Sequence, residues 1–347
     1  MIKKINRYRG KKVQMSFVSY EAYQRFAKRN PTLHKILEII EWKEIEEFLK
    51  NAFPSQARGQ IPFDPVCMFK ATLLGQWYSL SDPELEKRLS LNLDFIAFVG
   101  LDEAPDETTL CRFRNRLISN NLLEALLEMI NLQLEEKQLK VKTGSIVDAT
   151  LIQSACHPRK TIETIPEDRK ELDSSENSKN IKISYSKDEN ARWLKKGKKV
   201  YFGYKLFSRV DEANGYIEKL HITPANAYEG HHLDPLLDGL APKTRVYSDK
   251  GFTTKDNTKL LQKRKLKNAL MCKASKSKSL HFWEKERNRL ISKKRYIVEQ
   301  SFGILKRIFN MKRASYISSE KVLGECLLKS ICFNLNKAVR RISMSLT

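Results

Sequence analysis

The helix-forming stretch at residues 293–307 connects most features of this chain. It reads Lys293-Lys294-Arg295-Tyr296-Ile297-Val298-Glu299-Gln300-Ser301-Phe302-Gly303-Ile304-Leu305-Lys306-Arg307. Apolar residues recur at i, i+4, i+7 and i+11, which predicts a helix with one buried stripe formed by Val298, Phe302, Leu305 and Phe309. Arg295, Glu299 and Lys306 follow a second stripe beside the first. Taken alone, Glu299 is open to a plain interpretation as a surface ion pair on an amphipathic helix.

Two aspartates upstream change the interpretation of Glu299. Asp148 lies in the middle of a predicted strand over residues 145–153, and Asp249 follows a predicted strand over residues 244–248. Aspartate is depleted in strands and costly to bury alone, which favours a functional role for Asp148. Asp249 precedes Lys250-Gly251 and could instead be a turn residue. Carboxylates on two strands and a helix are the ligands that a two-metal phosphoryl-transfer site needs.

The charge of the chain indicates a polyanionic partner. Of 347 residues, 64 are Lys or Arg and 41 are Asp or Glu, so the formal net charge is +23. Residues 251–315 hold +15 of this charge, with 19 Lys and Arg against 4 Asp and Glu. No apolar run reaches the roughly 18 residues of a membrane span, and no apolar signal core follows the first lysines. We therefore expect nucleic acid as the partner, no membrane, and a cytoplasmic location.

Patterning divides the chain into three parts. Residues 1–33 are basic and weakly patterned, which favours a flexible arm. Residues 34–143 are nearly all helical, beginning with one helix over 33–53, and are interpreted as an independent domain for DNA binding and assembly. Helix starts are marked by capping residues such as Asp64-Pro65 and Asp106. Residues 144–347 mix strands and helices, with a polar excursion at 155–198 that we expect to be mobile.

The order of elements in residues 144–347 predicts an α/β fold with a mixed sheet. Strands are expected over residues 145–153, 200–210 and 216–223, and the last two are joined by the hairpin signal Asn214-Gly215. A short helix over 228–240, a strand over 244–248 and further helices and a strand follow. Three antiparallel strands and then parallel strands with crossover helices make up this fold class.

Several stretches resemble the DDE transposases of bacterial insertion sequences and are most similar to the IS5 family. In the helical half the similar stretches are Phe63-Asp64-Pro65 and residues 106–114. Further along they are Ile146-Val147-Asp148-Ala149-Thr150, Tyr201-Phe202-Gly203-Tyr204-Lys205, Thr223-Pro224-Ala225-Asn226, Ser248-Asp249-Lys250-Gly251-Phe252 and the stretch from Arg295 to Lys306. Each motif alone is weak, but their common order makes the resemblance specific over roughly residues 35–340.

The resemblance implies a ribonuclease H-like catalytic core behind an all-helical N-terminal domain. In such a core, Asp148, Asp249 and Glu299 would be the catalytic carboxylates and would bind two Mg²⁺ ions, with Mn²⁺ as a substitute. Arg295 and Lys306 match the Arg-x3-Glu-x6-Lys part of the family signature, and they are expected to contact DNA phosphates.

One position departs from the family signature. The tyrosine often found three residues before the arginine is absent; Ser292 occupies its place, and Tyr296 lies on the other side. This puts the phosphate contact of that position in doubt, while the three carboxylates are unaffected. Glu284 and Glu286 could compete for the third acidic position, but neither has the flanking Arg and Lys pattern.

The resulting hypothesis is a transposase. It would bind the terminal inverted repeats of its element as double-stranded DNA, cleave there and join the ends to target DNA, as a homodimer on the DNA. A catalytically inactive DNA-binding relic or regulator of transposition is the alternative, and a structure-specific nuclease is a third. Lys276 and Lys278 of the basic segment are expected to contact DNA, and Trp193 could stack on a base or equally cover the sheet.

Overall fold

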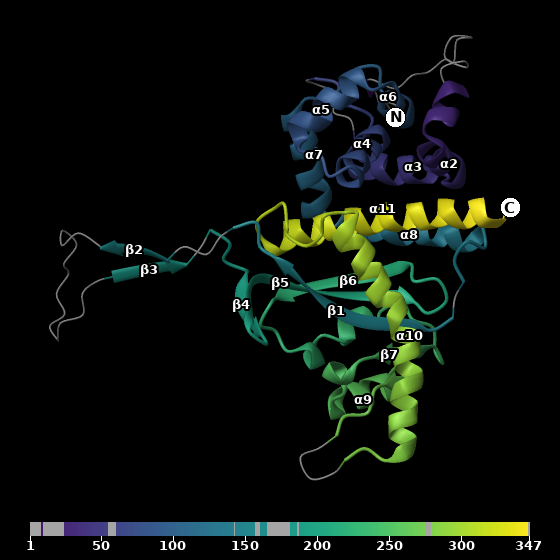
Figure 1. Cartoon of the computed structure of the whole chain (residues 1–347). Helices are drawn as coiled ribbons and strands as arrows, with labels where there is room; N and C mark the ends of the chain where they lie inside the picture. The colour runs from purple at the N-terminus through teal and green to yellow at the C-terminus, as the bar shows by residue number, and fades with distance from the viewer. Residues whose placement is uncertain are drawn as a thin grey trace, which may run out of the picture.

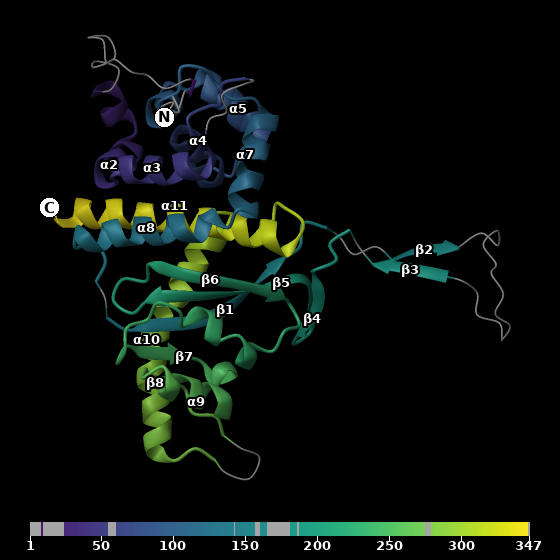
Figure 2. The same cartoon turned by 180° about the vertical axis from the view of Figure 1, so that it is seen from behind.

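The computed structural model describes residues 8–9, 24–54, 60–141, 143–156, 160–164, 181–185, 187–274 and 279–345 (Figure 1). Helices gather at one end of the molecule, and a sheet flanked by further helices forms the rest (Figures 1 and 2). Most of the predicted arm at residues 1–33 and much of the excursion at 155–198 lie outside the described residues. Lys276 and Lys278 lie outside them as well.

The N-terminal region is helical, as predicted. Its helices are α2 (Pro31–Ile39), α3 (Trp42–Ala52), α4 (Pro65–Trp77), α5 (Asp82–Leu91), α6 (Leu93–Val99), α7 (Glu107–Ser119) and α8 (Leu122–Glu136). The Asp64 side chain accepts from the Val66 N–H at the start of α4, and Asp106 accepts from the Thr109 N–H at the start of α7. Gly100 ends α6 in the left-handed conformation, at φ +78°.

The single helix predicted over residues 33–53 is wrong, because the structure has two helices there. Ile40 is extended (φ −94°, ψ 130°) and ends α2. The Gln133 side chain of α8 accepts from the Glu41 N–H at 2.9 Å and donates to the Glu41 carbonyl at 3.2 Å. These tertiary hydrogen bonds satisfy the backbone at the break. Apolar periodicity continues across it, so the local pattern carries no sign of the interruption.

A six-stranded mixed sheet forms the centre of the remaining chain. Its strands are β1 (Ser145–Gln153), β4 (Arg192–Lys196), β5 (Lys199–Asp211), β6 (Ile217–Pro224), β7 (Arg245–Ser248) and β8 (Lys267–Leu270). β5 pairs antiparallel with β1, β4 and β6, whereas β7 lies parallel to β1 and β8. Gly215, at φ +71°, makes the turn between β5 and β6. The predicted order of antiparallel and then parallel strands is confirmed.

The remaining elements are β2 (Lys160–Thr164), β3 (Ile181–Tyr185), η1 (Glu229–His231), η2 (Asp234–Leu236), η3 (Lys250–Phe252), α9 (Lys255–Lys263), α10 (Phe282–Arg307) and α11 (Ser319–Ser345). Two regions among them differ from the prediction. The short helix predicted over 228–240 is two 3-10 turns, since Pro235 and the left-handed Gly239 interrupt a helix. Within residues 155–198, β2 and β3 form a hairpin that projects from the body (Figures 1 and 2), and β4 joins the main sheet.

Alternation along the strands separates two apolar cores. Ile146 and Tyr247 lie in the core that includes buried side chains of α10 and α11. Val147 and Val246 face a second core, which includes side chains of α9, η2 and η3. Because neighbouring strand residues point to opposite faces, Asp148 shares the face of Ile146, beneath α10.

The last helix joins the two halves of the chain. α11 packs against α2, α4, α7 and α8 and also against β6 (Figures 1 and 2). One core contains Leu73 of α4, Cys332 and Leu335 of α11 and Ile217 of β6. The helical region therefore shares its core with the C-terminal helix beyond residue 143. Within the described ranges, α11 included, no helix has the length and apolarity needed to cross a membrane.

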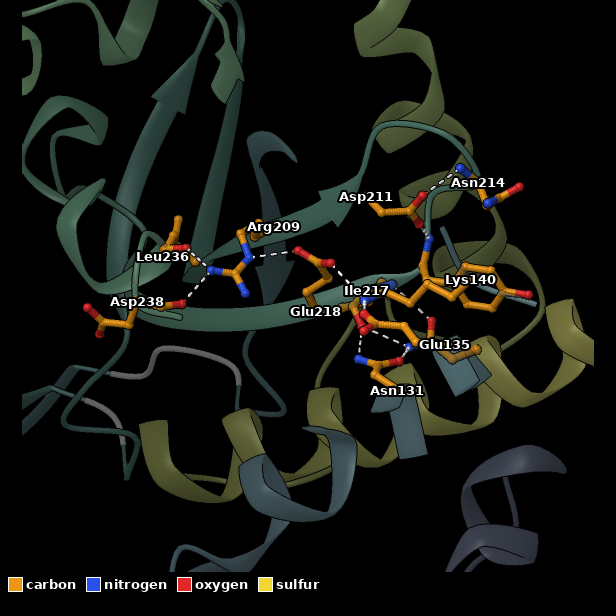
Figure 3. Close-up of polar contacts among 12 residues, drawn as sticks. Asn131, Glu135, Lys140, Arg209, Asp211, Asn214, Ile217, Glu218, Leu236 and Asp238 are labelled. Atoms are coloured by element: carbon orange, nitrogen blue, oxygen red, sulfur yellow. Dashed lines mark hydrogen bonds and ion pairs between the residues drawn. The ribbon is translucent and has the colours of Figure 1, made fainter. Parts of the chain in front are cut away.

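Polar groups fix the same junction (Figure 3). The side-chain amides of Asn131 and Asn334 both donate to the Ile217 carbonyl, at 2.9 Å and 2.8 Å, and the Ile217 N–H donates to Asn334 Oδ1. Lys140, which follows α8, pairs with Glu218 of β6 at 2.9 Å. Buried polar groups need such partners, so the contacts set the position of α8 and α11 on β6.

Candidate active site

Two carboxylates lie side by side on the face of the sheet beneath α10. β1 and β7 are parallel neighbours with Ile146 opposite Tyr247, and Asp148 and Asp249 each follow this pair by two residues, so both belong to the same face. Asp148 is 9% exposed, and its Oδ1 accepts from the Ala149 N–H at 2.8 Å. The two strands therefore carry their aspartates to one edge of the sheet.

Asp249 begins the turn that follows β7. Its Oδ1 accepts from the Gly251 N–H at 2.8 Å and so caps η3. The turn role considered for Asp249 is therefore real. It coexists with proximity to Asp148, because the negative charge of Asp249 helps to raise the pKa of Asp148.

Helix α10 brings Arg295 and Glu299 to the same place. Val298 and Phe302 are buried against the sheet and orient the helix. Arg295 Nη2 lies 2.8 Å from Asp148 Oδ2 and 3.9 Å from Glu299 Oε1. The guanidinium thus bridges two of the three predicted catalytic carboxylates. The Glu299 side chain is 64% exposed and remains open to solvent or substrate.

The electrostatics of Asp148 are set by opposing influences. Burial is the largest and raises its pKa above the ordinary aspartate value. The charge of Asp249 acts in the same direction, whereas Arg295 and the Ala149 N–H stabilise the ionised form. The net shift is upward, so Asp148 holds a proton more readily than an exposed aspartate does.

The donor set at this place fits a hard divalent cation. Asp148, Asp249 and Glu299 offer carboxylate oxygens, which Mg²⁺ prefers. In the part of the chain that the structure describes, no three acidic, histidine or cysteine side chains converge as a metal cluster. The Arg295 guanidinium is the positive charge closest to two of the three carboxylates, at 2.8 Å from Asp148 Oδ2 and 3.9 Å from Glu299 Oε1.

Lys306 lies apart from the carboxylates, in a basic cluster. It is eleven residues from Arg295 along α10, or about 16 Å of helix axis. Burial lowers the pKa of Lys306, and the nearby charges of Lys196 and Lys312 lower it further. Lys306 is partly buried, whereas Lys196 and Lys312 are exposed, and such a group of mutually repulsive cations is suited to a phosphate of a polyanion.

Trp193 fits both interpretations offered for it. Its side chain is 53% exposed on β4, and its ring centroid lies 5.2 Å from that of Phe202 on β5. One part of the indole covers the strand beside it, and the remainder faces solvent.

Glu229 carries no signal of its own in the sequence, yet the structure brings it close to the turn of Asp249. Glu229 Oε1 pairs with Lys205 Nζ at 3.2 Å, and its other oxygen approaches Gly251. The available hint was the stretch Thr223-Pro224-Ala225-Asn226, which ends three residues before Glu229.

Two known protein families match this chain. Residues 139–335, more than half of the chain, match the family described as transposase DDE domain, and residues 20–116 match the transposase domain (DUF772). The chain belongs to the DDE transposase family. The predicted fold class is confirmed at this level: a helical region precedes the mixed sheet and helices of a DDE domain consistent with a ribonuclease H-like core.

This DDE transposase resembles one curated relative closely and one solved structure distantly. It is 45% identical over 234 residues to the transposase for insertion sequence element IS1106 of Neisseria meningitidis serogroup B, covering 67% of this chain and 78% of the relative. The cryo-EM structure of the piggyBac transposase synaptic complex with hairpin DNA covers 94% of this chain and 80% of that one, at 12% identity and a TM-score of 0.39.

Proposed function

We propose that this DDE transposase binds the terminal inverted repeats of a bacterial insertion sequence and catalyses DNA strand cleavage and strand transfer. The close relative is named as the transposase of such an element. One observation supports the chemistry above all: Asp148 and Asp249 lie together beneath α10, where Arg295 links Asp148 to Glu299.

Asp148, Asp249 and Glu299 would hold two Mg²⁺ ions, for which Mn²⁺ can substitute. When bound, the metal activates the attacking water or 3′-OH and stabilises the leaving oxygen of an in-line displacement at phosphorus. Arg295, once released from Asp148, would donate to a phosphate beside the scissile bond. The buried setting of Asp148 limits access of water and strengthens these charge interactions.

We propose a DNA path that runs from the carboxylates along the basic surfaces. The cluster of Lys196, Lys306 and Lys312 supports this path, because the phosphates of DNA would neutralise the mutual repulsion of three neighbouring lysines. Trp193, on the same strand as Lys196, would stack on an exposed base. The residues assigned to DNA contact are Arg295, Lys306, Trp193, Lys276 and Lys278.

The division of labour between the two regions is also a proposal. The helical region 34–143 would supply much of the end recognition and assembly, and region 144–347 the chemistry, in a homodimer on double-stranded DNA. A bacterial transposase of this kind would act in the cytoplasm. The match of residues 20–116 to a separate transposase domain family supports a distinct role for the helical region.

The direct test uses the full-length protein and a DNA that carries both inverted repeats of its element. With Mg²⁺ and a target plasmid we expect cleavage at the repeat ends and covalent joining to the plasmid. Cleavage without joined product would favour a structure-specific nuclease. Binding without either product would favour a catalytically inactive relic or regulator.

A further inference from the structure

Two 3-10 turns bring a carboxylate outside the triad toward Asp249. Glu229 lies in η1, on the connection that follows β6, and η1 packs against η3, which Asp249 begins. A methyl group on Gly251 would stand 2.5 Å from Glu229 Oε2 and 3.1 Å from Asp249 Oδ1. Both oxygens therefore face one point above the turn, a point that only a glycine leaves open.

A buried lysine holds Glu229 in this orientation. Lys205 lies on β5, is 7% exposed, and places its Nζ 3.2 Å from Glu229 Oε1. The same Nζ donates to the Ala227 carbonyl at 2.7 Å, which ties the connection to the sheet. A lysine anchored at both contacts fixes one oxygen of Glu229 and leaves Oε2 directed at Gly251.

The glycine after Glu229 keeps η1 close to its neighbours. A methyl group on Gly230 would stand 2.5 Å from the Tyr228 ring and 2.8 Å from the Thr254 side chain. Asn257 at the start of α9 donates to the Gly230 carbonyl at 2.8 Å. The turn is thus fixed from two sides, and so is the backbone that carries Glu229.

The two carboxylates near Gly251 differ in their ion pairing. Arg295 pairs with Asp148, and Lys205 pairs with Glu229. The ion pairs of the described residues provide no cation for Asp249. Lys205 contacts Oε1 of Glu229, whereas Oε2 and Asp249 Oδ1 face the shared point at Gly251, and two carboxylate oxygens that face one point suit a divalent ion.

We propose that Glu229 is a fourth carboxylate of the catalytic site, and that its Oε2 binds a divalent metal ion jointly with Asp249. Lys205 is then a positioning residue, which acts through Glu229. The inference rests on the proposed function, because the metal is the one that strand transfer needs. A purely structural Glu229 would serve only to neutralise the buried Lys205.

The test measures Mn²⁺ binding to the full-length protein without DNA, by calorimetric titration. Glu229→Gln keeps the shape of the side chain and removes its charge, and Asp256→Asn is the matched control, since Asp256 is exposed on α9. We expect Glu229→Gln to bind Mn²⁺ about tenfold more weakly than wild type, and Asp256→Asn to bind like wild type. Equal affinity of Glu229→Gln and wild type would overturn the proposal.

A second variant covers the case in which Glu229→Gln does not fold. Glu229→Asp keeps the charge on a shorter side chain, and circular dichroism melting checks both variants. We expect Glu229→Asp to have weakened Mn²⁺ affinity and to regain wild-type strand transfer at raised Mn²⁺. A folded Glu229→Asp with wild-type affinity and wild-type metal dependence would also overturn the proposal.

Failure here is distinguishable from failure of the proposed function. If Asp249→Asn abolishes strand transfer while Glu229→Gln binds Mn²⁺ normally, the transposase stands and Glu229 leaves the site. If Asp249→Asn still transfers strands at the wild-type rate, the triad fails, and the Mn²⁺ titration still decides whether Glu229 binds metal.

Discussion

Arg295 is the residue on which the state of the site depends most directly. It lies 2.8 Å from Asp148 and opposes the upward shift that burial imposes on the pKa of that aspartate. A carboxylate must be ionised to bind a metal ion, so Arg295 acts in two ways. It favours the ionised form of Asp148, and it lies between Asp148 and Glu299.

Replacing Arg295 by Gln should separate these two effects. Loss of the cation raises the pKa of Asp148 further, so Mn²⁺ affinity should fall at a higher pH than in wild type as the solution is acidified. Well above that pKa the variant should bind Mn²⁺ at least as tightly, because no guanidinium competes for Asp148. Calorimetric titrations of Mn²⁺ binding across the acidic and neutral range measure both effects. Coincident curves of affinity against pH for the variant and the wild type would refute both roles of Arg295.

At the scale of elements, the basic cluster around Lys306 combines the end of β4 (Lys196), the end of α10 (Lys306) and the turn that follows α10 (Lys312). Lys196→Gln together with Lys312→Gln should flatten the slope of log K against log salt for duplex DNA by about two units if both lysines contact phosphates. Sequence preference should change little, because phosphate contacts position the duplex without reading it. Salt titrations of binding provide the slopes.

A matched pair of lysines on α9 serves as the control. Lys255→Gln with Lys259→Gln removes the same charge from exposed positions of that helix and should leave the slope nearly unchanged. If both double variants give the wild-type slope, DNA does not pass the Lys306 cluster. Lys276→Glu with Lys278→Glu is titrated in the same way. If both lysines contact phosphates as proposed, their loss should flatten the slope of log K against log salt by about two units.

The junction of α8, α11 and β6 depends on the fully buried Asn334. Its side chain accepts from the Ile217 N–H and donates to the Ile217 carbonyl. Asn334→Leu leaves that N–H without its partner, so we expect a loss of about 3 kcal/mol in the free energy of unfolding, measured in urea. Asn336→Leu, partly exposed on the same helix, should cost well under half as much; similar losses would show that the hydrogen bonds contribute little.

The starts of α4 and α7 depend on neighbouring residues and were predictable, whereas the break between α2 and α3 depends on a distant contact and was not. Asp64 and Asp106 cap their helices within three residues, so α4 and α7 begin where the sequence indicates. The break between α2 and α3 depends on Gln133, which lies about 90 residues away. No periodicity within residues 33–53 reports that contact.

The candidate site follows the same division. Asp148, Asp249 and Glu299 stand in motifs with recognisable order, and the structure places Arg295 of α10 2.8 Å from Asp148 and 3.9 Å from Glu299. Glu229 becomes a candidate only when η1 packs against η3, because nothing local distinguishes it from other exposed acids. The position of Arg295 between Asp148 and Glu299 likewise becomes visible only in the folded chain.

At the scale of the whole molecule, α11 packs against both the N-terminal helices and the sheet. The expected independent helical domain therefore shares its core with a helix from the C-terminal end of the chain. Residues 1–143 alone would lack the C-terminal helix that fills their core, with Cys332 donating to the Leu73 carbonyl across the junction. We expect this fragment to unfold without cooperativity, and a peptide of residues 319–345 to increase its helicity in circular dichroism. A cooperative transition of the fragment by itself would show that it folds without α11.

The central claim is that Asp148, Asp249 and Glu299 carry out the chemistry of a DDE transposase. The most direct measurement compares strand transfer and DNA binding for Asp148→Asn, Asp249→Asn and Glu299→Gln in the full-length protein with Mg²⁺ and with Mn²⁺. Each variant should lose strand transfer by at least about a thousandfold, since each would remove a proposed ligand of the metal ions, and should bind inverted-repeat DNA nearly as well as wild type. Strand transfer at the wild-type rate by one of the variants would contradict the assignment of that residue. Strand transfer at the wild-type rate by all three would contradict the proposed catalytic site.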